Sequence, residues 1–185
     1  MMVAAVVEQE RLLFVDECGT HTSLAPIYDY APRGKRLHLT VPRKRGKNTT
    51  LLSSMSLKGM EPSMAVEGAT TARVFETYVE QVLAPSLEEG QVVVMDNLGA
   101  HRPKRIEELI EHRGCELLYL PAYSSRLQPP IEEALAKIKN LLRRAAARSK
   151  ETLLDTIGAA LCAITTEDAQ GFFEHAGYRP TAHLL

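Results

Sequence analysis

Short apolar runs and longer stretches with helical spacing alternate along this chain. The short runs, rich in valine and leucine and bounded by polar or turn-forming residues, are typical of buried strands. The run at 91–96 lies between two helical patterns, as expected of a central parallel strand covered on both faces. Ala31-Pro-Arg-Gly34 is typical of a turn, and we expect a strand on each side of it, forming a hairpin. Strands are also predicted at 11–16, 49–57, 91–96 and 116–120, with a further turn at 58–59.

Helical periodicity fills much of the remaining sequence. Val74, Tyr78 and Val82 recur at i,i+4 spacing, and a longer stripe begins at Ile131 and Leu135. The strand–helix–strand order at 91–120 predicts a right-handed crossover between parallel strands. The order of elements predicts an α/β fold in which helices flank a mixed sheet. Helices are predicted at 70–83, 103–112, 130–148, 150–164 and 167–176.

The composition fits one globular domain. The 185 residues, 45% hydrophobic and 24% charged, can form a single unit over 1–185, with a core at about 10–148 and C-terminal helices at 150–177. No apolar run approaches the roughly 20 residues that cross a bilayer, and the apolar start at 1–7 lacks the basic leader of a signal peptide. The three cysteines form no CxxC pair, so we expect a reduced, cytoplasmic protein without structural zinc.

The net charge of −1 conceals an uneven distribution of charge. Segment 33–47 holds seven basic residues and segment 137–150 holds six, both without an acid, together 13 of the 22 in the chain. Such segregation would attract phosphates along one side of the molecule, as a nucleic-acid partner requires. For either segment alone, a solvated surface is an equal alternative. The candidate DNA contacts in these segments are Arg43, Lys44, Arg45, Lys47, Lys139 and Arg143.

Three acids follow predicted elements in a way that suggests chemistry. Asp16 and Asp96 end two predicted strands, at the sheet edge where α/β folds bind ligands. Glu132 lies in the first turn of a predicted helix, whose positive end favours a carboxylate. A single acid at a strand end is more often a turn or cap residue, but three converging carboxylates need a cation, and oxygen ligands suit Mg²⁺ or Mn²⁺. Two such ions about 4 Å apart can catalyse phosphodiester transfer.

The residues around these acids form a recognisable set. Phe14-Val-Asp-Glu17, Val94-Met-Asp-Asn97 with His101, and Leu120-Pro-Ala-Tyr-Ser124 precede Pro130-Ile-Glu-Glu-Ala134 with Lys137 and Lys139. Over about residues 10–180, this set resembles the DDE endonuclease domain of bacterial insertion-sequence transposases in the mariner superfamily. The resemblance implies a ribonuclease H-like fold, two Mg²⁺ ions (with Mn²⁺ as substitute), and cleavage and strand transfer at transposon ends. It also implies that Asp16, Asp96 and Glu132 are catalytic metal ligands.

The chain departs from the family pattern just before the third acid. The family usually has Ser-Pro-Asp-Leu-Asn-Pro there, whereas this chain has Ser124-Ser-Arg-Leu-Gln-Pro-Pro130, one residue longer. With 79 residues between the first two acids and 35 between Asp96 and Glu132, Glu133 becomes a rival for the third position. Glu133 can form an i,i+4 pair with Lys137 on a solvated face, whereas Glu132 lies beside the apolar stripe, so Glu132 is favoured.

Several neighbouring residues are weaker candidates. Asn97, His101 and Tyr123 are expected within reach of DNA, with a structural hydrogen bond for His101 and loop packing for Tyr123 as alternatives. Glu17 should point to the opposite face of the sheet from Asp16, because side chains alternate along a strand. Cys18 has no histidine pattern that would make it a nucleophile, so we expect a small core residue.

The resemblance also bears on partners and alternatives. Mariner-type transposases bind their terminal repeats through helix-turn-helix modules before the catalytic domain, and only about ten residues precede the first predicted strand here. We therefore expect that module to be encoded separately or to be missing from this chain, with transposon ends and target DNA as partners and a homodimer as a family expectation. Two alternative functions remain: a ribonuclease H-like nuclease on other nucleic acids, and a decayed transposase that only binds DNA or assists assembly.

Overall fold

A six-stranded mixed sheet forms the centre of the computed structural model, which describes residues 8–28, 30–36, 38, 40–44, 46–97, 104–121 and 129–178. The strand order is β3–β2–β1–β5–β6, and β4 pairs with a different stretch of β2. β1 runs antiparallel to β2 and parallel to β5, and β5 runs parallel to β6. The predicted mixed sheet is confirmed. The strands are β1 (Leu12–Thr20), β2 (Thr49–Ser56), β3 (Gly59–Met60), β4 (Met64–Glu67), β5 (Val92–Met95) and β6 (Glu116–Tyr119).

Helices occur at each of the predicted positions. Thr71 caps the first of them by accepting a hydrogen bond from the backbone of Val74, and that helix continues through a π-helical turn past Leu83. The short strands β3 and β4 were not predicted. The helices are η1 (Gln9–Arg11), α1 (Ala72–Tyr78), the π-helical η2 (Val79–Leu83), α2 (Ala84–Ser86), α3 (Lys104–Glu111), α4 (Pro130–Ala145), α5 (Lys150–Cys162) and α6 (Thr166–His175).

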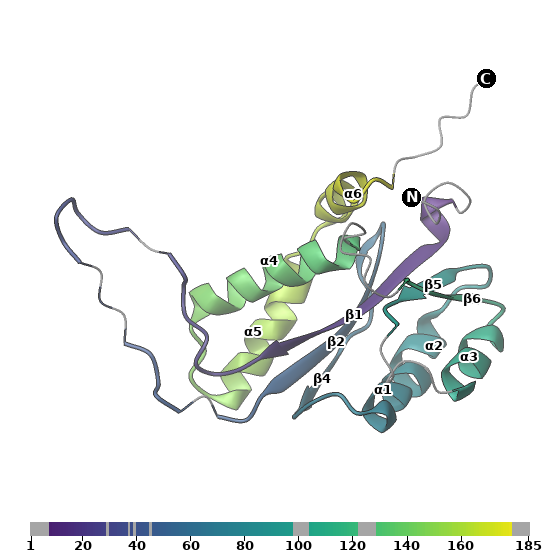
Figure 1. Cartoon of the computed structure of the whole chain (residues 1–185), viewed down its shortest axis with the longest axis horizontal. Coiled ribbons are helices and arrows are strands. Elements are labelled where there is room, and N and C mark those ends of the chain that lie inside the picture. The colour runs from purple at the N-terminus through teal and green to yellow at the C-terminus, as the bar shows by residue number, and fades with distance from the viewer. Residues whose placement is uncertain are drawn as a thin grey trace, which may run out of the picture.

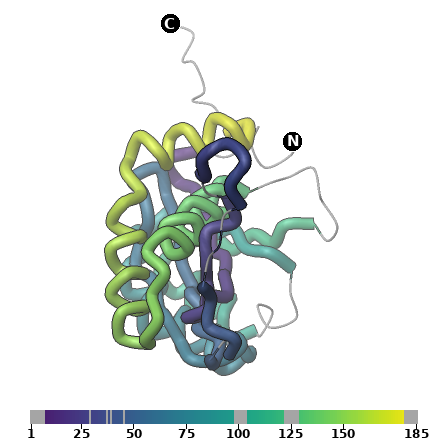
Figure 2. Tube along the Cα trace, turned by 90° about the vertical axis from the view of Figure 1, so that its left-hand side faces the viewer, coloured from purple at the N-terminus to yellow at the C-terminus, as the bar shows by residue number. Residues whose placement is uncertain are grey.

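The helices cover the sheet on both faces. In Figures 1 and 2, α4, α5 and α6 lie on one face, and α1, α2 and α3 lie on the other. Each face has its own apolar core, one centred on Ile131 and Ile138 of α4, the other on Phe75 and Ile106. α6 is tied to β1 by aromatic contacts, because Phe14 meets Phe173 and Tyr178 edge-on at centroid distances of 5.5 and 5.2 Å.

The side chains of the two central strands alternate strictly between these cores. In β1, Leu12, Phe14 and Cys18 face the α4 side, whereas Leu13 and Val15 face the α1 side. In β5, the residues on the α4 side are Val92 and Val94, and those on the α1 side are Val93 and Met95. Even-numbered residues of both strands therefore share the α4 face, which decides where the acids of these strands lie.

The hairpin predicted around 31–34 is wrong. Instead, β1 and β2 pair with each other as antiparallel strands. Residues 21–48 form the long connection between them, which is here called the arm. No described arm residue is in a strand, and every described residue from 27 to 48 is exposed, with prolines at 32 and 42 that cannot donate backbone hydrogen bonds. In Figure 1 the arm extends away from the sheet and helices, so it has no neighbouring strand with which to pair.

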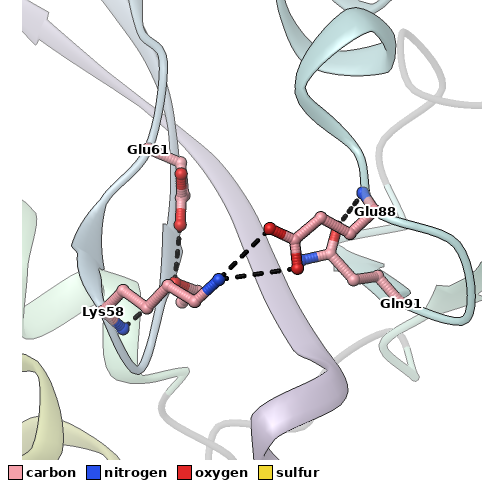
Figure 3. Close-up of polar contacts among 5 residues, drawn as sticks. Lys58, Glu61, Glu88 and Gln91 are labelled. Carbon is pink, nitrogen blue, oxygen red and sulfur yellow. Dashed lines mark hydrogen bonds and ion pairs between the residues drawn. The ribbon is translucent and has the colours of Figure 1, made fainter.

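The opposite end of the sheet is held by polar contacts at the β2–β3 turn. Lys58 donates to both carboxylate oxygens of Glu88, at 3.2 and 3.5 Å, and Gln91 accepts a hydrogen bond from the backbone of Glu88 at 2.9 Å (Figure 3). Ser56 donates to Glu61 at 2.7 Å across the same turn. These exposed contacts join β2 and β3 to the segment that leads into β5.

Within the described ranges, no helix is long and apolar enough to cross a membrane.

Candidate metal and DNA-binding site

Asp16 and Asp96 lie next to each other on the α4 face of the sheet. Val15 pairs with Met95 in the parallel β1–β5 ladder, so each aspartate follows one of two paired residues. Both are partly buried. Asp96 directly follows β5, as predicted, but Asp16 does not end its strand, because β1 continues to Thr20 by pairing with β2. The site therefore lies where β5 ends beside the middle of β1.

Glu132 enters this region from the start of α4. The helix begins at Pro130, which is buried, and Glu132 is exposed in its first turn. The negative charges of Asp96 and Glu132 both raise the pKa of Asp16, so each of them lies within electrostatic range of Asp16. Although Glu132 as a whole is exposed, partial desolvation of its carboxylate raises its pKa, an effect opposite to the one expected from the helix dipole.

Glu133 points in a different direction. Its carboxylate is 2.6 Å from Nδ1 of His175 in α6, and the side chain lines a groove between α4 and α6 together with Lys137 and Phe172. The predicted pair between Glu133 and Lys137 is not formed; Lys137 instead binds Asp168 at 2.5 Å. The packing of α6 against α4 supplies both partners, and sequence spacing within α4 could not foresee them.

Burial dominates the electrostatics of Asp16. Desolvation raises its pKa to about 6, and the nearby carboxylates of Asp96, Glu132 and Glu17 add to the rise. The backbone N–H of Glu17 donates to Oδ1 of Asp16 at 2.7 Å and opposes part of that shift. An acid held in this environment is stabilised as a carboxylate when a cation is bound beside it.

We expect Asp16→Asn to stabilise the metal-free protein at pH 7.5. Because the pKa of Asp16 is higher in the folded chain than its ordinary value of 3.8, folding binds a proton between about pH 4 and 6, and stability is lost as pH rises through that window. The shift corresponds to about 2 to 3 kcal/mol. Urea unfolding in EDTA should show a gain of this order for the variant at pH 7.5 and little gain at pH 4. If the variant and the parent were equally stable at pH 7.5, the result would contradict the burial of this charge.

The donor set suits a hard divalent cation, although the described residues do not form a closed metal site. Carboxylate oxygens that repel each other fit Mg²⁺ or Mn²⁺. Among the residues that the structure describes, no group of three or more His, Cys, Asp or Glu side chains lies close enough together to hold a metal. Oδ1 of Asn97, directly after Asp96, is buried without a hydrogen-bond partner in the part of the chain that the structure describes, and it is a further oxygen near this edge.

Two of the residues predicted to contact DNA belong to α4. The positive charge of Lys139 lowers the pKa of Cys18, which lies two residues after Asp16 on the same face of β1, so Lys139 lies on the side of α4 toward this strand. Burial raises the pKa of Cys18 to about 11, which agrees with the expected core role. Arg143 donates to Asn140 at 2.8 Å and lines a hollow of about 280 Å³ between α4 and the start of the arm.

Four of the predicted contacts belong to the arm. Arg43 and Lys44 are exposed there, and so is Lys47, which forms an ion pair with Glu67 at 2.6 Å. Arg45, His101 and Tyr123 lie outside the described residues.

The anchoring of the arm was not predicted. Nη1 of Arg148 donates to the backbone oxygens of Thr22 and Leu24 at 3.0 and 2.9 Å, across more than 120 residues of sequence. Glu67 binds Lys150 at 2.8 Å as well as Lys47, and these hydrogen bonds lower the pKa of Glu67 to about 2. Both ends of the arm are thus fixed near the α4–α5 turn, by contacts that no local pattern in the sequence predicts.

Comparison with known proteins agrees with this architecture. The family of the DDE superfamily endonuclease matches residues 11–154, well over half of the chain. No curated protein matches it in sequence. Among solved structures it is similar to the Mos1 transposase paired-end complex with left transposon end (18% identity, TM-score 0.69, covering 91% of this chain and 52% of that one). It is also similar to the Mos1 mariner paired-end complex with Mn, at 19% identity and a TM-score of 0.68, covering 90% of this chain and 52% of that one. The catalytic domain of Mos1 mariner transposase is similar at 17% identity and a TM-score of 0.65, covering 91% of this chain and 78% of that one.

These likenesses establish the fold. The chain spans about half the length of the Mos1 chains in the paired-end complexes, and more than three quarters of the isolated catalytic domain. The predicted ribonuclease H-like arrangement is confirmed by that structural match. The family match over residues 11–154 goes further than shape, because it rests on the sequence itself. The chain belongs to the DDE superfamily of endonucleases.

Proposed function

We propose that this chain is the catalytic domain of a transposase that cuts and rejoins DNA at transposon ends. The observation that carries the proposal is the placement of Asp16 and Asp96 side by side on the α4 face. Glu132, at the start of α4, lies within electrostatic range of Asp16. Membership of the DDE superfamily and the fold shared with Mos1 transposase, solved with transposon ends and with Mn, support it. The whole protein that acts on DNA would include a further DNA-recognition module.

The three acids would hold two Mg²⁺ or Mn²⁺ ions. When bound, such ions activate an attacking oxygen and stabilise a leaving oxygen in phosphodiester transfer. Asp16 and Asp96 would bind the metal ions from the two neighbouring strands, and Glu132 would supply the third carboxylate from α4. Because burial raises the pKa of Asp16 to about 6, a cation bound beside it would favour the ionised form, so metal binding and deprotonation of this acid would be linked.

The proposed reaction has two steps, hydrolysis and then strand transfer. In the first, water attacks the phosphorus at the transposon end, the bond from phosphorus to the 3′ oxygen breaks, and the 3′ oxygen gains a proton. In the second, that 3′ hydroxyl attacks a phosphorus of target DNA, a new phosphorus–oxygen bond forms, and the target strand leaves with a free 3′ hydroxyl. The chain's own contribution would be to hold the metal ions with the three acids and to attract the DNA phosphates with basic residues such as Lys139.

The arm and the outer end of α4 would bind the DNA backbone. Arg43 and Lys44 are exposed on an arm that extends from the sheet, and Arg143 lies where the arm crosses α4. Tyr28 and Tyr30 are 91% and 100% exposed on the same arm, where aromatic rings can contact sugars and bases. Asn97, His101 and Tyr123 remain candidates for contacts closer to the acids.

Replacing Arg43, Lys44 and Arg45 with Ala should weaken DNA binding and flatten its salt dependence. Each lost phosphate contact reduces the slope of log K against log salt by about 0.9, so the triple variant should lose up to about 2.7. Fluorescence anisotropy with a labelled duplex over a salt series measures the slope. Replacing Arg105 with Ala, on α3 and paired with Glu80, is the matched charge control. A triple variant with the parental slope would mean that these residues are simply solvated.

The test of the proposed chemistry is a nicking assay on supercoiled plasmid. Cleavage that needs Mg²⁺ or Mn²⁺, stops with EDTA and leaves 3′ hydroxyl ends supports the proposal. One observation favours a second candidate: the described acids do not form a closed metal site, as in a module that binds DNA without cutting it. DNA binding without cleavage and without any effect of Mn²⁺ would favour that second function.

A further inference from the structure

The middle of β2 carries a buried hydroxyl that the fold does not require. All eight residues of β2 are buried, because β1 lies on one side of the strand, β3 and β4 pair along the other, and helices cover both faces. Ser53 is 0% exposed, and its Oγ has no hydrogen-bond partner among the described residues. A buried hydroxyl left unpaired typically costs about 1 to 3 kcal/mol, so an apolar side chain would suit this position better.

Ser53 lies directly opposite Asp16. The antiparallel β1–β2 register pairs the two residues, and cross-strand partners project from the same face of a sheet. Leu51 and Met55, two residues before and after Ser53, belong to the α4-side core, which confirms the face independently. Cross-strand Cβ atoms are about 5 Å apart, a separation that rotation of a serine side chain can reduce to hydrogen-bond distance from an aspartate oxygen.

Asp16 has an oxygen available for such a donor. The backbone N–H of Glu17 already donates to Oδ1, and no hydrogen bond to Oδ2 is present among the described residues. The neighbouring carboxylates Asp96 and Glu132 repel this group, so its orientation depends on donors from β1 and β2. The backbone fixes one oxygen, and Ser53 is the buried side-chain hydroxyl across the strand pair from the other.

We propose that Ser53 is a positioning residue: its hydroxyl, which has no partner among the described residues, would turn to donate to Oδ2 of Asp16 when a divalent cation binds and would hold the carboxylate in the orientation that binds the cation. The inference rests on the proposed function, since it concerns the same metal site. It assigns a role to a strand that contributes none of the three acids. A serine selected only for its small size would serve equally well as alanine, and that difference makes the inference testable.

The test compares Ser53→Ala with Ser54→Ala. Ser54 is also fully buried in β2 but pairs with Val15 and lies on the opposite face, near Tyr78. Mn²⁺ binding is measured by electron paramagnetic resonance of the free ion, with and without a short DNA duplex, and unfolding is measured in EDTA. Loss of a donor to a metal ligand typically lowers metal affinity by about tenfold or more, so we expect this for Ser53→Ala and no change for Ser54→Ala.

The unfolding measurement separates positioning from packing. Ser53→Ala should be as stable as the parent or more stable in EDTA, because it removes a hydroxyl that is unpaired there. Mn²⁺ affinity equal to the parent's in Ser53→Ala would overturn the inference while leaving the proposed function intact. A parent protein that binds no Mn²⁺ even with DNA would overturn both. Equal losses in the two serine variants would mean that β2 packing alone was disturbed.

Discussion

Asp96→Asn protein is expected to lose metal-dependent DNA cleavage by at least about a hundredfold while keeping its fold. The substitution preserves the size and shape of the side chain but replaces one acceptor oxygen by an NH2 donor and removes a negative charge directly beside Asp16. Metal ions contribute several kcal/mol to phosphodiester transfer, and each 1.4 kcal/mol is a factor of ten in rate. Plasmid nicking in Mg²⁺ and in Mn²⁺ measures the loss.

Two controls make this result specific. Circular dichroism should match the parent, and stability to urea in EDTA should be equal or slightly higher, because the substitution removes a negative charge that repels Asp16. Affinity for duplex DNA at fixed salt should be unchanged or slightly higher, since a negative charge near the phosphates has been removed. Cleavage by Asp96→Asn at the parental rate, in a preparation free of contaminating nuclease, would remove Asp96 from the catalytic set.

Glu132→Gln and Glu133→Gln should behave differently although the residues are adjacent. Glu132 acts electrostatically on Asp16, whereas Glu133 contacts His175 of α6 at 2.6 Å. We expect Glu132→Gln to reduce cleavage by about a hundredfold, as for loss of a metal ligand, and Glu133→Gln to stay within about twofold of the parent. The same plasmid assay and an Mn²⁺ titration of each variant measure both effects.

The pair of variants decides the register of the third acid. Because the Glu133 contact with His175 is exposed on the histidine side, its loss should change the free energy of unfolding by no more than about 1 kcal/mol. If Glu133→Gln were the inactive variant and Glu132→Gln the active one, the extra residue before Pro130 would have shifted the third acid by one position.

Periodicity in the sequence was enough to predict most of the fold. Strands at 91–96 and 116–120 and the helix that contains Ile131 and Ile138 are present close to their predicted bounds, because their apolar spacing reflects burial against one another. The π-helical turn at Val79–Leu83 and the two-residue β3 carry no distinct pattern and were not predicted.

The errors have a common physical origin in long-range pairing. β1 extends beyond Asp16 to Thr20 because β2 pairs with it along that length, and a strand's end depends on its partner more than on its own residues. The arm contains turn-forming residues that suggest a local hairpin, but its ends are fixed by Arg148 and by Glu67, both distant in sequence. Propensity alone cannot supply those contacts.

The candidate site was easier to predict than its surroundings. Alternation along β1 and β5 places Asp16 and Asp96 on one face, with Glu17 on the other, as expected from the sequence. The partners of Glu133 and Lys137 come from α6, and the position of Ser53 opposite Asp16 depends on the β1–β2 register, so neither could be foreseen.

The most direct test of the central claim is an anomalous difference map from crystals soaked in Mn²⁺, with a DNA end bound. The proposed function predicts a peak held by carboxylate oxygens of both Asp16 and Asp96, with Glu132 approaching the same ion or a second one about 4 Å away. Soaking of Asp96→Asn crystals should remove or weaken that peak. Well-ordered DNA beside the acids with no anomalous peak between Asp16 and Asp96 would contradict a metal-dependent catalytic site in this chain.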